Sequence, residues 1–378
     1  MIVCEGHNIY SPLGTTSEEN YSNVLKGNSA LRLYEDRWNL PEPFFASMFD
    51  RERAELEFDL LKPMQRYTFF EKIAILSIQK ALEGTDVDAS GSDVLFVVSS
   101  TKGNVELLET DPEKFGYERE LLGTSATLIA DFFGNHNVPM TVSNACISGV
   151  SAQVFAMRIL NSMPYRHVIV IGADVLSPFI ITGFQSLKAL SQEACRPFDA
   201  MRCGLNLGEA AATVIFGKAE NAEKGTWTAV NGAIRNDANH ISGPSRTGEG
   251  NFRALRMLEK DFDKKDLACI NAHGTSTLYN DEMESIAITR AGLEGVPVGS
   301  LKGYYGHTLG AAGILESVLC MQATDHHKVL GTKGFETLGV SGKISVCGSH
   351  RDTTGNSFIK MLSGFGGCNA AMLYHKIS

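Results

Sequence analysis

The chain has 378 residues, 43% of them hydrophobic and 20% charged, with a formal net charge of −9 at pH 7. This composition is typical of a soluble globular enzyme with a substantial core. The negative charge argues against broad nucleic-acid binding, which requires a basic surface, and the apolar runs, such as Val94–Val98 and Val168–Gly172, are too short to span a membrane.

The amino-terminal segment Met1–His7 has no basic flank followed by a long apolar run, so we expect no signal peptide. The eight cysteines are scattered, without a Cys-x-x-Cys pair or a matched histidine cluster. This distribution disfavours a zinc site and a disulfide framework. We therefore expect a cytoplasmic protein with reduced thiols and no bound metal.

Short apolar runs alternate with longer amphipathic segments, among them an expected helix at Gln65–Leu82, and this pattern is typical of an α/β protein. Three segments of the first half recur in the same order in the second half. The matched pairs are 93–104 with 266–277, 140–152 with 298–313, and 211–218 with 370–376. Three matches in one order indicate a long internal duplication with a polar joint near 220–227. The predicted halves are residues 1–220 and 221–378.

Cys146 lies between a strand-like segment and the helical pattern Gln153–Leu160, and its small neighbours permit a tight turn. A thiol at the start of a helix is close to unpaired N–H groups and to the positive end of the helix dipole, which are expected to lower its pKa. This position favours a nucleophile. The alternative is a buried structural cysteine, the ordinary role of a lone thiol.

Two histidines, His273 and His307, also follow strand-like segments, and each is next to a glycine. Ligands of α/β sheets bind beyond the carboxyl ends of the strands, so the duplication is expected to bring both rings towards Cys146. Lys302 could orient His307 or hold it neutral through its positive charge. The candidate carboxylate partners of this lysine are Asp281, Glu284 and Glu316. The alternative for each histidine is a local bond to the backbone.

The segment Ser363–Asn369 is rich in glycine and precedes the last strand-like run. Such a turn can direct a backbone N–H group at an oxyanion. It is not a nucleotide fingerprint, because no G-x-G-x-x-G follows a strand at the required spacing. Cys368, within this segment, is expected to be a packing residue.

Together these segments resemble the β-ketoacyl synthases of the thiolase superfamily, in their elongating Cys-His-His branch. The motifs that carry the resemblance are Ala145-Cys146-x-Ser148-Gly149, His273-Gly-Thr275-x-Thr277, Lys302-x-x-x-Gly306-His307-x-x-Gly-Ala-Ala-Gly313 and Gly364-Phe365-Gly-Gly367-x-Asn369. Further matches are Arg196-Pro-Phe-Asp199, Arg202-x-Gly204, Gly208-Glu209 and Asp237-Ala-x-His240. They occur in the family's order over almost the entire chain, so the set is far more specific than any single motif.

The resemblance implies a thiolase-like five-layer αβαβα fold built from two duplicated halves, usually as a homodimer. It implies decarboxylative Claisen condensation of an acyl thioester with malonyl-acyl carrier protein, with no bound cofactor and with substrates carried on phosphopantetheine. The implied catalytic residues are Cys146, His273, His307, Lys302 and Phe365. In this scheme Cys146 carries the acyl group, and the two histidines stabilise the enolate. The N–H groups of Cys146 and Phe365 would bind the tetrahedral oxyanion.

The resemblance also implies contacts with the substrate arm and with the carrier. Phe365 would gate entry of the second substrate, and the residues implied to line the phosphopantetheine tunnel are Ser242, Thr275, Thr277 and Gly366. Lys62 and Arg66 lie at the expected start of the helix Gln65–Leu82, and Arg202 is expected near the tunnel mouth. All three match positions that contact the acyl carrier protein, and the alternative is three ordinary solvated charges.

The chain departs from the family pattern in several places. It is shorter around residues 35–60 and 103–124, and Leu362, Ser363 and Ala210 replace residues expected at their positions. The catalytic set is intact. The acyl length, the pathway and the choice between homodimer and heterodimer stay open, and the shorter segments favour a specialised polyketide or polyene system over fatty-acid elongation.

Three rival interpretations have less support. A thiolase needs a second cysteine as a base near the glycine-rich turn, where Phe365 stands. An initiating Cys-His-Asn synthase would have asparagine in place of His307. A non-catalytic, chain-length-determining partner subunit of a heterodimeric synthase lacks the nucleophile, whereas this chain has Cys146.

Overall fold

The structure, a computed structural model, describes residues 1–110 and 112–378. Its main sheet has 11 strands in the order β13-β11-β10-β15-β16-β9-β1-β8-β6-β4-β5. Strands from the first half of the chain are β1 (Ile2–Tyr10), β4 (Val94–Ser99), β5 (Met140–Val142), β6 (His167–Asp174) and β8 (Ala210–Lys218). Strands from the second half are β9 (Trp227–Asn236), β10 (Leu267–Asn271), β11 (Pro297–Gly299), β13 (Ser345–Val346), β15 (Ser357–Gly364) and β16 (Cys368–Lys376).

The two halves of this sheet repeat one strand order. In β5-β4-β6-β8-β1 the first two pairings are parallel and the last two antiparallel. The same holds for β11-β10-β15-β16-β9. The halves meet where β1 pairs with β9 at Val3 and Thr228, and the chain passes from one half to the other between Lys218 and Trp227. The duplication expected from the sequence is thus visible in the strand order.

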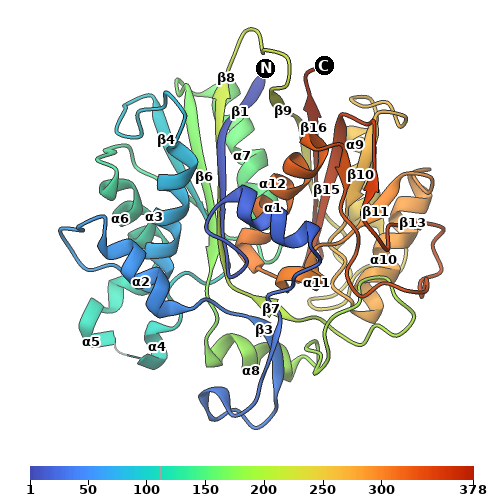
Figure 1. Cartoon of the computed structure of the whole chain (residues 1–378), viewed down its shortest axis with the longest axis horizontal. Helices are drawn as coiled ribbons and strands as arrows, with labels where there is room; N and C mark the ends of the chain where they lie inside the picture. The colour runs from blue at the N-terminus through green and yellow to red at the C-terminus, as the bar shows by residue number, and fades with distance from the viewer. Residues whose placement is uncertain (111) are drawn as a thin grey trace.

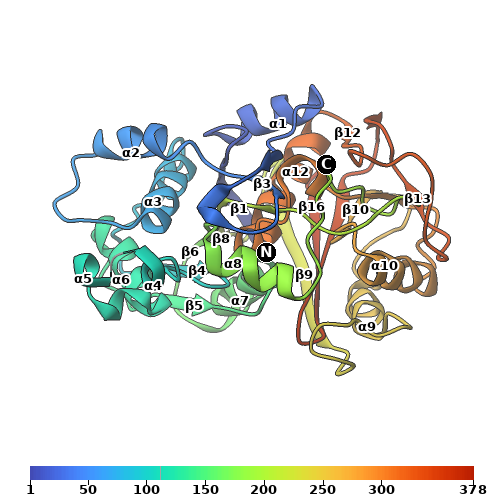
Figure 2. The same cartoon turned by 90° about the horizontal axis from the view of Figure 1, so that it is seen from below.

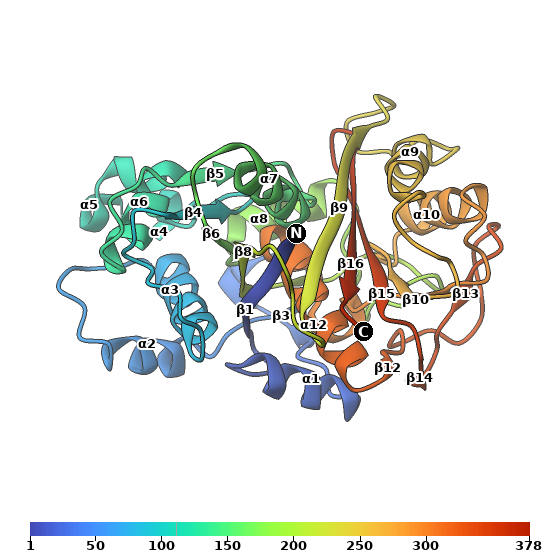
Figure 3. The ribbon, with the colours of Figure 1, turned by 90° about the horizontal axis from the view of Figure 1, so that it is seen from above.

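Helices complete a five-layer arrangement. The central layer consists of α7 (Ser148–Ser162) and α12 (Ala312–Asp325), which pack against strands of both halves. The outer face of the first half is covered by α3 (Phe69–Leu82) and α6 (Leu122–Phe132), and that of the second half by α9 (Glu249–Leu258) and α10 (Leu278–Arg290). Figure 1 shows this succession from left to right, and in Figures 2 and 3 the two outer helix pairs again lie at opposite ends. This is the αβαβα architecture expected from the resemblance.

Alternating side chains of the buried strand β4 contribute to two cores. Leu95 and Val97 belong to the central core with α7, whereas Val94, Phe96 and Val98 belong to the outer core with α3 and α6. All five side chains are at most 1% exposed. A strand covered on both faces is apolar at every position, which explains the continuous apolar run in this part of the sequence.

The remaining elements lie at the edges of these layers. The helices are α1 (Ser17–Leu25), α2 (Arg51–Asp59), α4 (Leu107–Thr110), α5 (Pro112–Phe115), α8 (Pro178–Ser186) and α11 (Lys302–Tyr305). A small sheet contains β2 (Arg32–Tyr34), β3 (Phe44–Ser47) and β7 (Leu207–Gly208), and β12 (Lys328–Val329) pairs with β14 (Arg351–Asp352). Within the described residues, no helix combines the length and the hydropathy needed to cross a membrane.

The helix expected at Gln65–Leu82 begins four residues later, at Phe69. The hydroxyl of Thr68 accepts the N–H of Glu71 at 3.3 Å, and the Glu71 carboxylate accepts the N–H of Thr68 at 2.9 Å. This reciprocal capping box satisfies free N–H groups and sets the start of the helix. Gln65 and its neighbour Arg66 therefore lie in the loop before α3.

Candidate active site

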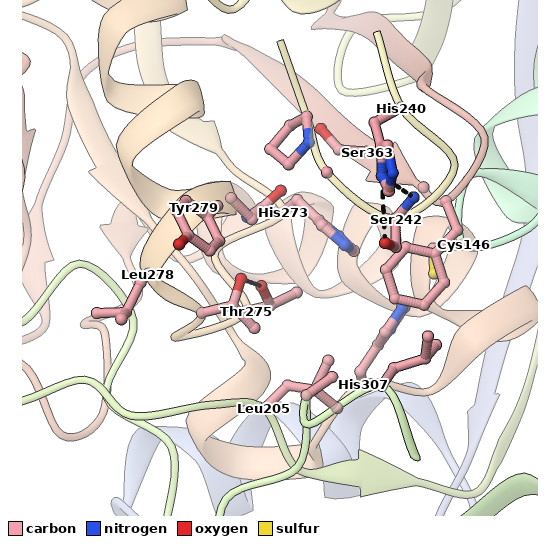
Figure 4. A pocket seen from close by; sticks show the side chains of 18 of the residues that line it. Cys146, Leu205, His240, Ser242, His273, Thr275, Leu278, Tyr279, His307 and Ser363 are labelled. Carbon is pink, nitrogen blue, oxygen red and sulfur yellow. Dashed lines mark hydrogen bonds between the residues drawn. The ribbon is translucent and has the colours of Figure 1, made fainter. Parts of the chain in front are cut away.

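The predicted nucleophile and the two histidines converge on one pocket of about 410 Å³. Cys146 stands between β5 and α7, His273 follows the end of β10, and His307 lies between α11 and α12. Figure 4 shows these three side chains along the wall of the pocket. The segments that carry them all leave the carboxyl ends of strands, which is where α/β sheets place their ligand sites.

A strained turn presents Cys146. Ala145 before it has a φ of +45°, a left-handed conformation that is unfavourable for a residue with a Cβ. The Ser148 hydroxyl accepts the N–H of Asn144 at 2.7 Å and donates to the carbonyl of Ala145 at 2.6 Å, which stabilises the turn. A Cβ at Gly364 would stand 3.1 Å from the Cys146 nitrogen. Glycine at this position therefore lets the turn between β15 and β16 approach the nucleophile.

The thiol of Cys146 is buried, with 8% exposure of the residue. Burial raises its pKa, while the charges of Lys102 and Lys302 and the N–H of Phe365 act in the opposite direction. The expectation that the helix start lowers this pKa is therefore wrong in direction. The loss of water at the buried end of α7 outweighs the helix dipole and the nearby cations. The resting group is therefore a thiol, and the two lysines with the Phe365 N–H offset part of the free-energy cost of forming the thiolate.

A backbone contact determines which nitrogen of His307 carries the proton. The N–H of Leu309 donates to Nδ1 of His307 at 3.3 Å, so the proton of the neutral ring is on Nε2. Burial and then the charges of Lys302 and Lys102 hold the pKa of His307 well below its usual range. Nε2 has no hydrogen-bond partner among the described residues. The ring is thus a neutral donor whose N–H is available to a substrate.

His273 is positioned through its own backbone. Its N–H and that of the following glycine donate to the Glu284 carboxylate, each at 2.7 Å. The centres of the His273 and His307 rings are 4.9 Å apart, and the rings meet at 84°. Burial and the charge of Lys302 hold the pKa of His273 well below its usual range. A ring nitrogen of each histidine and the sulfur of Cys146 lie within 4.8 Å of one another.

Lys302 and Lys360 share one buried carboxylate near the histidines. Both lysines are at most 1% exposed, and each pairs with one oxygen of Glu316, Lys360 at 2.7 Å. Burial alone would raise the pKa of Glu316, but the two ammonium groups hold it below its ordinary value. Two cations and one anion leave a net positive charge, which favours neutral imidazole rings. Sequence reasoning missed Lys360, whose signal is its place between apolar residues on both sides in strand β15.

The other two candidate partners of Lys302, Asp281 and Glu284, form no ion pair with it in the described part of the chain. Asp281 accepts the N–H groups of Thr275 at 3.0 Å and Ser276 at 3.1 Å, in the loop that carries the first histidine. Burial raises the pKa of Asp281 to about 6 and that of Glu284 to about 7. The expectation for these two carboxylates is wrong, because N–H groups of the adjacent loop satisfy them.

Three of the four expected substrate contacts line the pocket, namely Ser242, Thr275 and Thr277. Ser242 is exposed at the mouth, and the hydroxyls of the two threonines are 3.0 Å apart. Gly366 is not among the lining residues. Its N–H donates to the carbonyl of residue 241 at 2.6 Å, and its φ is +84°. Gly366 is exposed within this turn, and its contact with the substrate stays a prediction.

Phe365 and Cys368 occupy different places in the glycine-rich turn. The ring of Phe365 lines the pocket and stacks on Phe184 with the ring centres 5.9 Å apart, and its N–H contacts the sulfur of Cys146. Cys368 lies outside the pocket lining, and its thiol donates to the carbonyl of Phe365 at 3.2 Å. Burial raises the pKa of Cys368 to about 11. Cys368 is a packing residue, as expected.

The three expected carrier contacts differ in exposure. Lys62 and Arg66 are exposed in the loop between α2 and α3. Arg202 is only 9% exposed, and its guanidinium bonds to three backbone carbonyl groups. It donates to the carbonyl oxygens of Asp199 at 3.0 Å, Gly339 at 2.5 Å and Leu278 at 3.3 Å. The structure therefore contradicts a surface role for Arg202, while docking through the other two stays a prediction.

The thiol and the two imidazoles are also ligand types that bind zinc. Among the described residues they form the one cluster of His, Cys, Asp or Glu side chains whose ligand atoms are close enough to hold a metal ion. The same arrangement suits acyl transfer, which needs a soft nucleophile beside hydrogen-bond donors. The expectation of no bound metal stays a prediction.

Comparisons with known proteins cover the whole chain. Family models described as the N-terminal and C-terminal domains of β-ketoacyl synthase match residues 1–222 and 228–336. The 3-oxoacyl-[acyl-carrier-protein] synthase 2 of Vibrio cholerae is 27% identical over 426 aligned residues, which cover 100% of this chain and 99% of that protein.

Solved structures show the same likeness. A β-ketoacyl synthase from Burkholderia phymatum is 25% identical with a TM-score of 0.87, covering 100% of this chain and 99% of its own. A ketosynthase from Xenorhabdus doucetiae, solved in complex with its chain length factor, has a TM-score of 0.86 at 22% identity. That match covers 99% of this chain and 98% of the other, and it shows a likeness of fold.

Proposed function

The chain belongs to the β-ketoacyl synthase family, and on that premise we propose how its pocket joins an acyl thioester to a malonyl thioester. It is an acyltransferase in which Cys146 holds the acyl group while the two histidines act on the malonyl group. The observation that carries this assignment is the convergence of three reactive atoms within 4.8 Å. Both rings are neutral, and the proton of His307 is fixed on Nε2.

The first step transfers the acyl group to Cys146. The thiolate attacks the carbonyl carbon of the acyl thioester, and the resulting oxyanion accepts the N–H groups of Cys146 and Phe365. The carbon–sulfur bond to pantetheine then breaks, and the pantetheine thiol leaves with the proton that Cys146 has lost. The charges of Lys102 and Lys302 favour the thiolate during this step.

The second step uses the histidines. The malonyl thioester oxygen accepts hydrogen bonds from His273 and His307, and the bond to the terminal carboxylate breaks. Carbon dioxide leaves, and its bonding electrons form an enolate whose negative oxygen the two neutral donors stabilise. The enolate carbon attacks the acyl carbonyl on Cys146, and the thiolate departs to give a 3-oxoacyl thioester. Lys302 keeps the rings neutral and so acts as a positioning residue.

The substrates arrive on the phosphopantetheine arm of an acyl carrier protein, so the reaction requires no bound cofactor. The name of the Vibrio cholerae relative refers to such a carrier, and Ser242, Thr275 and Thr277 line the route of the arm. Lys62 and Arg66 offer exposed positive charges to an acidic carrier. The protein acts in the cytoplasm as a homodimer. The homodimer is supported by β5, which lies at the edge of the main sheet and so leaves main-chain N–H and C=O groups that a second copy can bind.

The proposed function is tested by incubating the purified chain with acyl carrier thioesters and malonyl carrier thioester. Intact-mass measurement should show one acyl group on Cys146, followed by release of carbon dioxide and a 3-oxoacyl product. Acyl mass on another residue, or carbon dioxide release without a carbon–carbon product, would contradict the proposal. Assays of the chain alone and of the chain mixed with a related second subunit distinguish homodimeric from heterodimeric activity.

A further inference from the structure

Lys102 is a positive charge near the nucleophile whose ammonium makes no contact required by the proposed reaction. It lies in the segment directly after β4, at the same end of the sheet as Cys146. The side chain is half-buried, and its ammonium donates to the Thr101 hydroxyl at 2.9 Å. The same ammonium lies 5.8 Å from the centre of the Phe184 ring. Phe184 lines the pocket and stacks on Phe365, so Lys102 reaches the aromatic pair beside the nucleophile.

Lys102 differs from the two buried lysines in its partners. Lys302 and Lys360 share Glu316, whereas no ion pair of Lys102 is present among the side chains that the structure describes, those of residues 1–109 and 114–378. Thr101 links Lys102 to a carboxylate, because its hydroxyl accepts from the Lys102 ammonium and donates to Asp174, which is fully buried.

Neutral donors already satisfy Asp174. It accepts the Thr101 hydroxyl at 2.9 Å, the Thr101 N–H at 3.0 Å, the Ser100 hydroxyl at 2.7 Å and the Gly310 N–H at 2.6 Å. These bonds fix Asp174 and leave the ammonium of Lys102 able to turn towards another anion. An unpaired ammonium in a half-buried position gains free energy when a carboxylate binds it.

The charge of Lys102 acts directly on the acylation site. Among the groups that lower the pKa of the Cys146 thiol, Lys102 has the largest effect, ahead of Lys302. It also lowers the pKa of His307. The geometric link to the site is Phe184, which lines the pocket and whose ring centre lies 5.8 Å from the Lys102 ammonium. Lys102 therefore lies beside the wall of the pocket that holds Cys146.

The path of an acyl chain bound to Cys146 follows from the lining of the pocket. The pantetheine arm enters past Ser242 and Tyr279 at the exposed mouth, and the histidines hold the malonyl thioester. The lining that remains for the acyl chain includes Phe184 and Leu205, and Lys102 lies beside the first of these. An alkyl chain there would remove water from the ammonium without replacing its hydrogen bonds.

We propose that Lys102 forms an anion subsite for the acyl group on Cys146. The protein then accepts acyl chains that end in a carboxylate a few carbons from the thioester in preference to alkyl chains of the same length. This inference rests on the proposed function, because Cys146 must first carry an acyl group. It concerns the acyl donor alone and leaves the malonyl step unchanged.

The test compares matched pantetheine thioesters without malonyl substrate, namely glutaryl with pentanoyl and adipoyl with hexanoyl. Acylation of Cys146 is followed by intact mass over time. In the native chain the carboxylate member of at least one pair should react about 10- to 100-fold faster, the range expected for one charge-assisted hydrogen bond. Lys102→Met should bring this ratio close to one, and Lys102→Arg should retain most of it.

Lys80→Met, a change at the surface of α3 where Lys80 pairs with Glu83, is the control for loss of a positive charge and should keep the native ratio. The subsite is refuted if the native chain prefers alkyl chains or if Lys102→Met keeps the native ratio. It is also refuted if Lys188→Met, which removes the exposed lysine of the pocket lining, abolishes the preference instead. Failure of every thioester to acylate the native chain would contradict the proposed function as well.

Discussion

The two halves of the molecule place different chemistry at the same junction between a strand and a helix. In the first half β5 leads through Cys146 into α7, and in the second half β11 leads through His307 to α12. Both residues are nearly enclosed, at 8% and 1% exposure. Burial raises the pKa of the thiol and lowers that of the imidazole, so both groups rest in their neutral forms. One backbone arrangement thus supports a nucleophile in one half and a hydrogen-bond donor in the other.

The buried acids near the two junctions differ in their partners. Asp174, from the first half, is held by hydroxyl and N–H groups. Glu316, from the second half, is held by two lysine ammonium groups. The second half therefore supplies a net positive region beside the histidines. The duplicated backbone brings the reactive groups together, and the buried charges set their protonation.

The largest effect is expected when the nucleophile of the first half is removed. Cys146→Ala should lower acyl transfer by roughly 10⁴- to 10⁶-fold, the range seen when an enzyme loses its nucleophile. Cys368→Ala is the matched control and should retain acylation, because Cys368 lies outside the pocket lining. Intact mass after incubation with an acyl thioester measures both variants. Acyl mass on Cys368 in the Cys146→Ala chain would overturn the assignment of the nucleophile.

A smaller effect is expected when the histidines of the second half are removed, and it should separate malonyl decarboxylation from acylation of the first half's Cys146. His273→Ala and His307→Ala should each lower decarboxylation of malonyl thioester by about 10²- to 10³-fold, as expected for loss of one preorganised donor. Acylation of Cys146 should continue in both variants, since its oxyanion contacts are backbone N–H groups. Carbon dioxide release and acyl mass are measured on the same samples. Undiminished release in either variant would remove that histidine from the mechanism.

The third prediction concerns the positive region of the second half. The charge of Lys360 helps to hold the pKa of His273 below its usual range. Lys360→Met should therefore raise that pKa, so His273 becomes protonated at a higher pH than in the native chain. A protonated ring would bind the malonyl carboxylate and resist its loss. The acid side of the pH–rate profile for carbon dioxide release should move up by about one pH unit.

Lys360→Arg is the matched variant for this experiment, since it keeps the charge beside Glu316 and should keep the native profile more closely. Thermal unfolding of each variant distinguishes loss of charge from loss of structure. A profile that falls uniformly at all pH values in Lys360→Met would mean that this lysine only supports packing. In that case Lys302 alone would account for the neutral rings.

Much of the fold and the site could be predicted from the sequence, because both depend on local patterns at strand ends. The repeated segments predict the repeated strand order, and the motifs around Cys146, His273 and His307 predict one shared pocket. The family is confirmed by the models that match both parts of the chain. Each of these features needs only the identity and order of neighbouring residues.

The errors arise where distant segments decide the outcome. The pKa of Cys146 is set by the depth of burial, and a helix start does not reveal that depth. Arg202 is buried where it bonds to carbonyl groups at residues 199, 278 and 339, and Lys360 pairs with Glu316 on α12, a distant segment of the chain. Contacts of this kind between distant segments can be recognised only in the three-dimensional structure.

The smallest expected effect tests whether the first half also receives the carrier. Lys62→Glu or Arg66→Glu should raise the apparent KM for carrier-bound substrate about 2- to 10-fold at low salt, because exposed charges steer an acidic partner over a screening length of about 8–10 Å. Both side chains are exposed, and the contact of Arg119 with residue 66 is to its backbone carbonyl, so the fold should be unaffected. Both variants should react with small pantetheine thioesters at the native rate. As a second control, Lys224→Glu reverses a charge in the exposed joint between the halves, and this variant should react with carrier-bound substrate at the native rate. Equal losses with carrier-bound and small substrates would place the effect on folding or assembly, and docking through this loop would then be rejected.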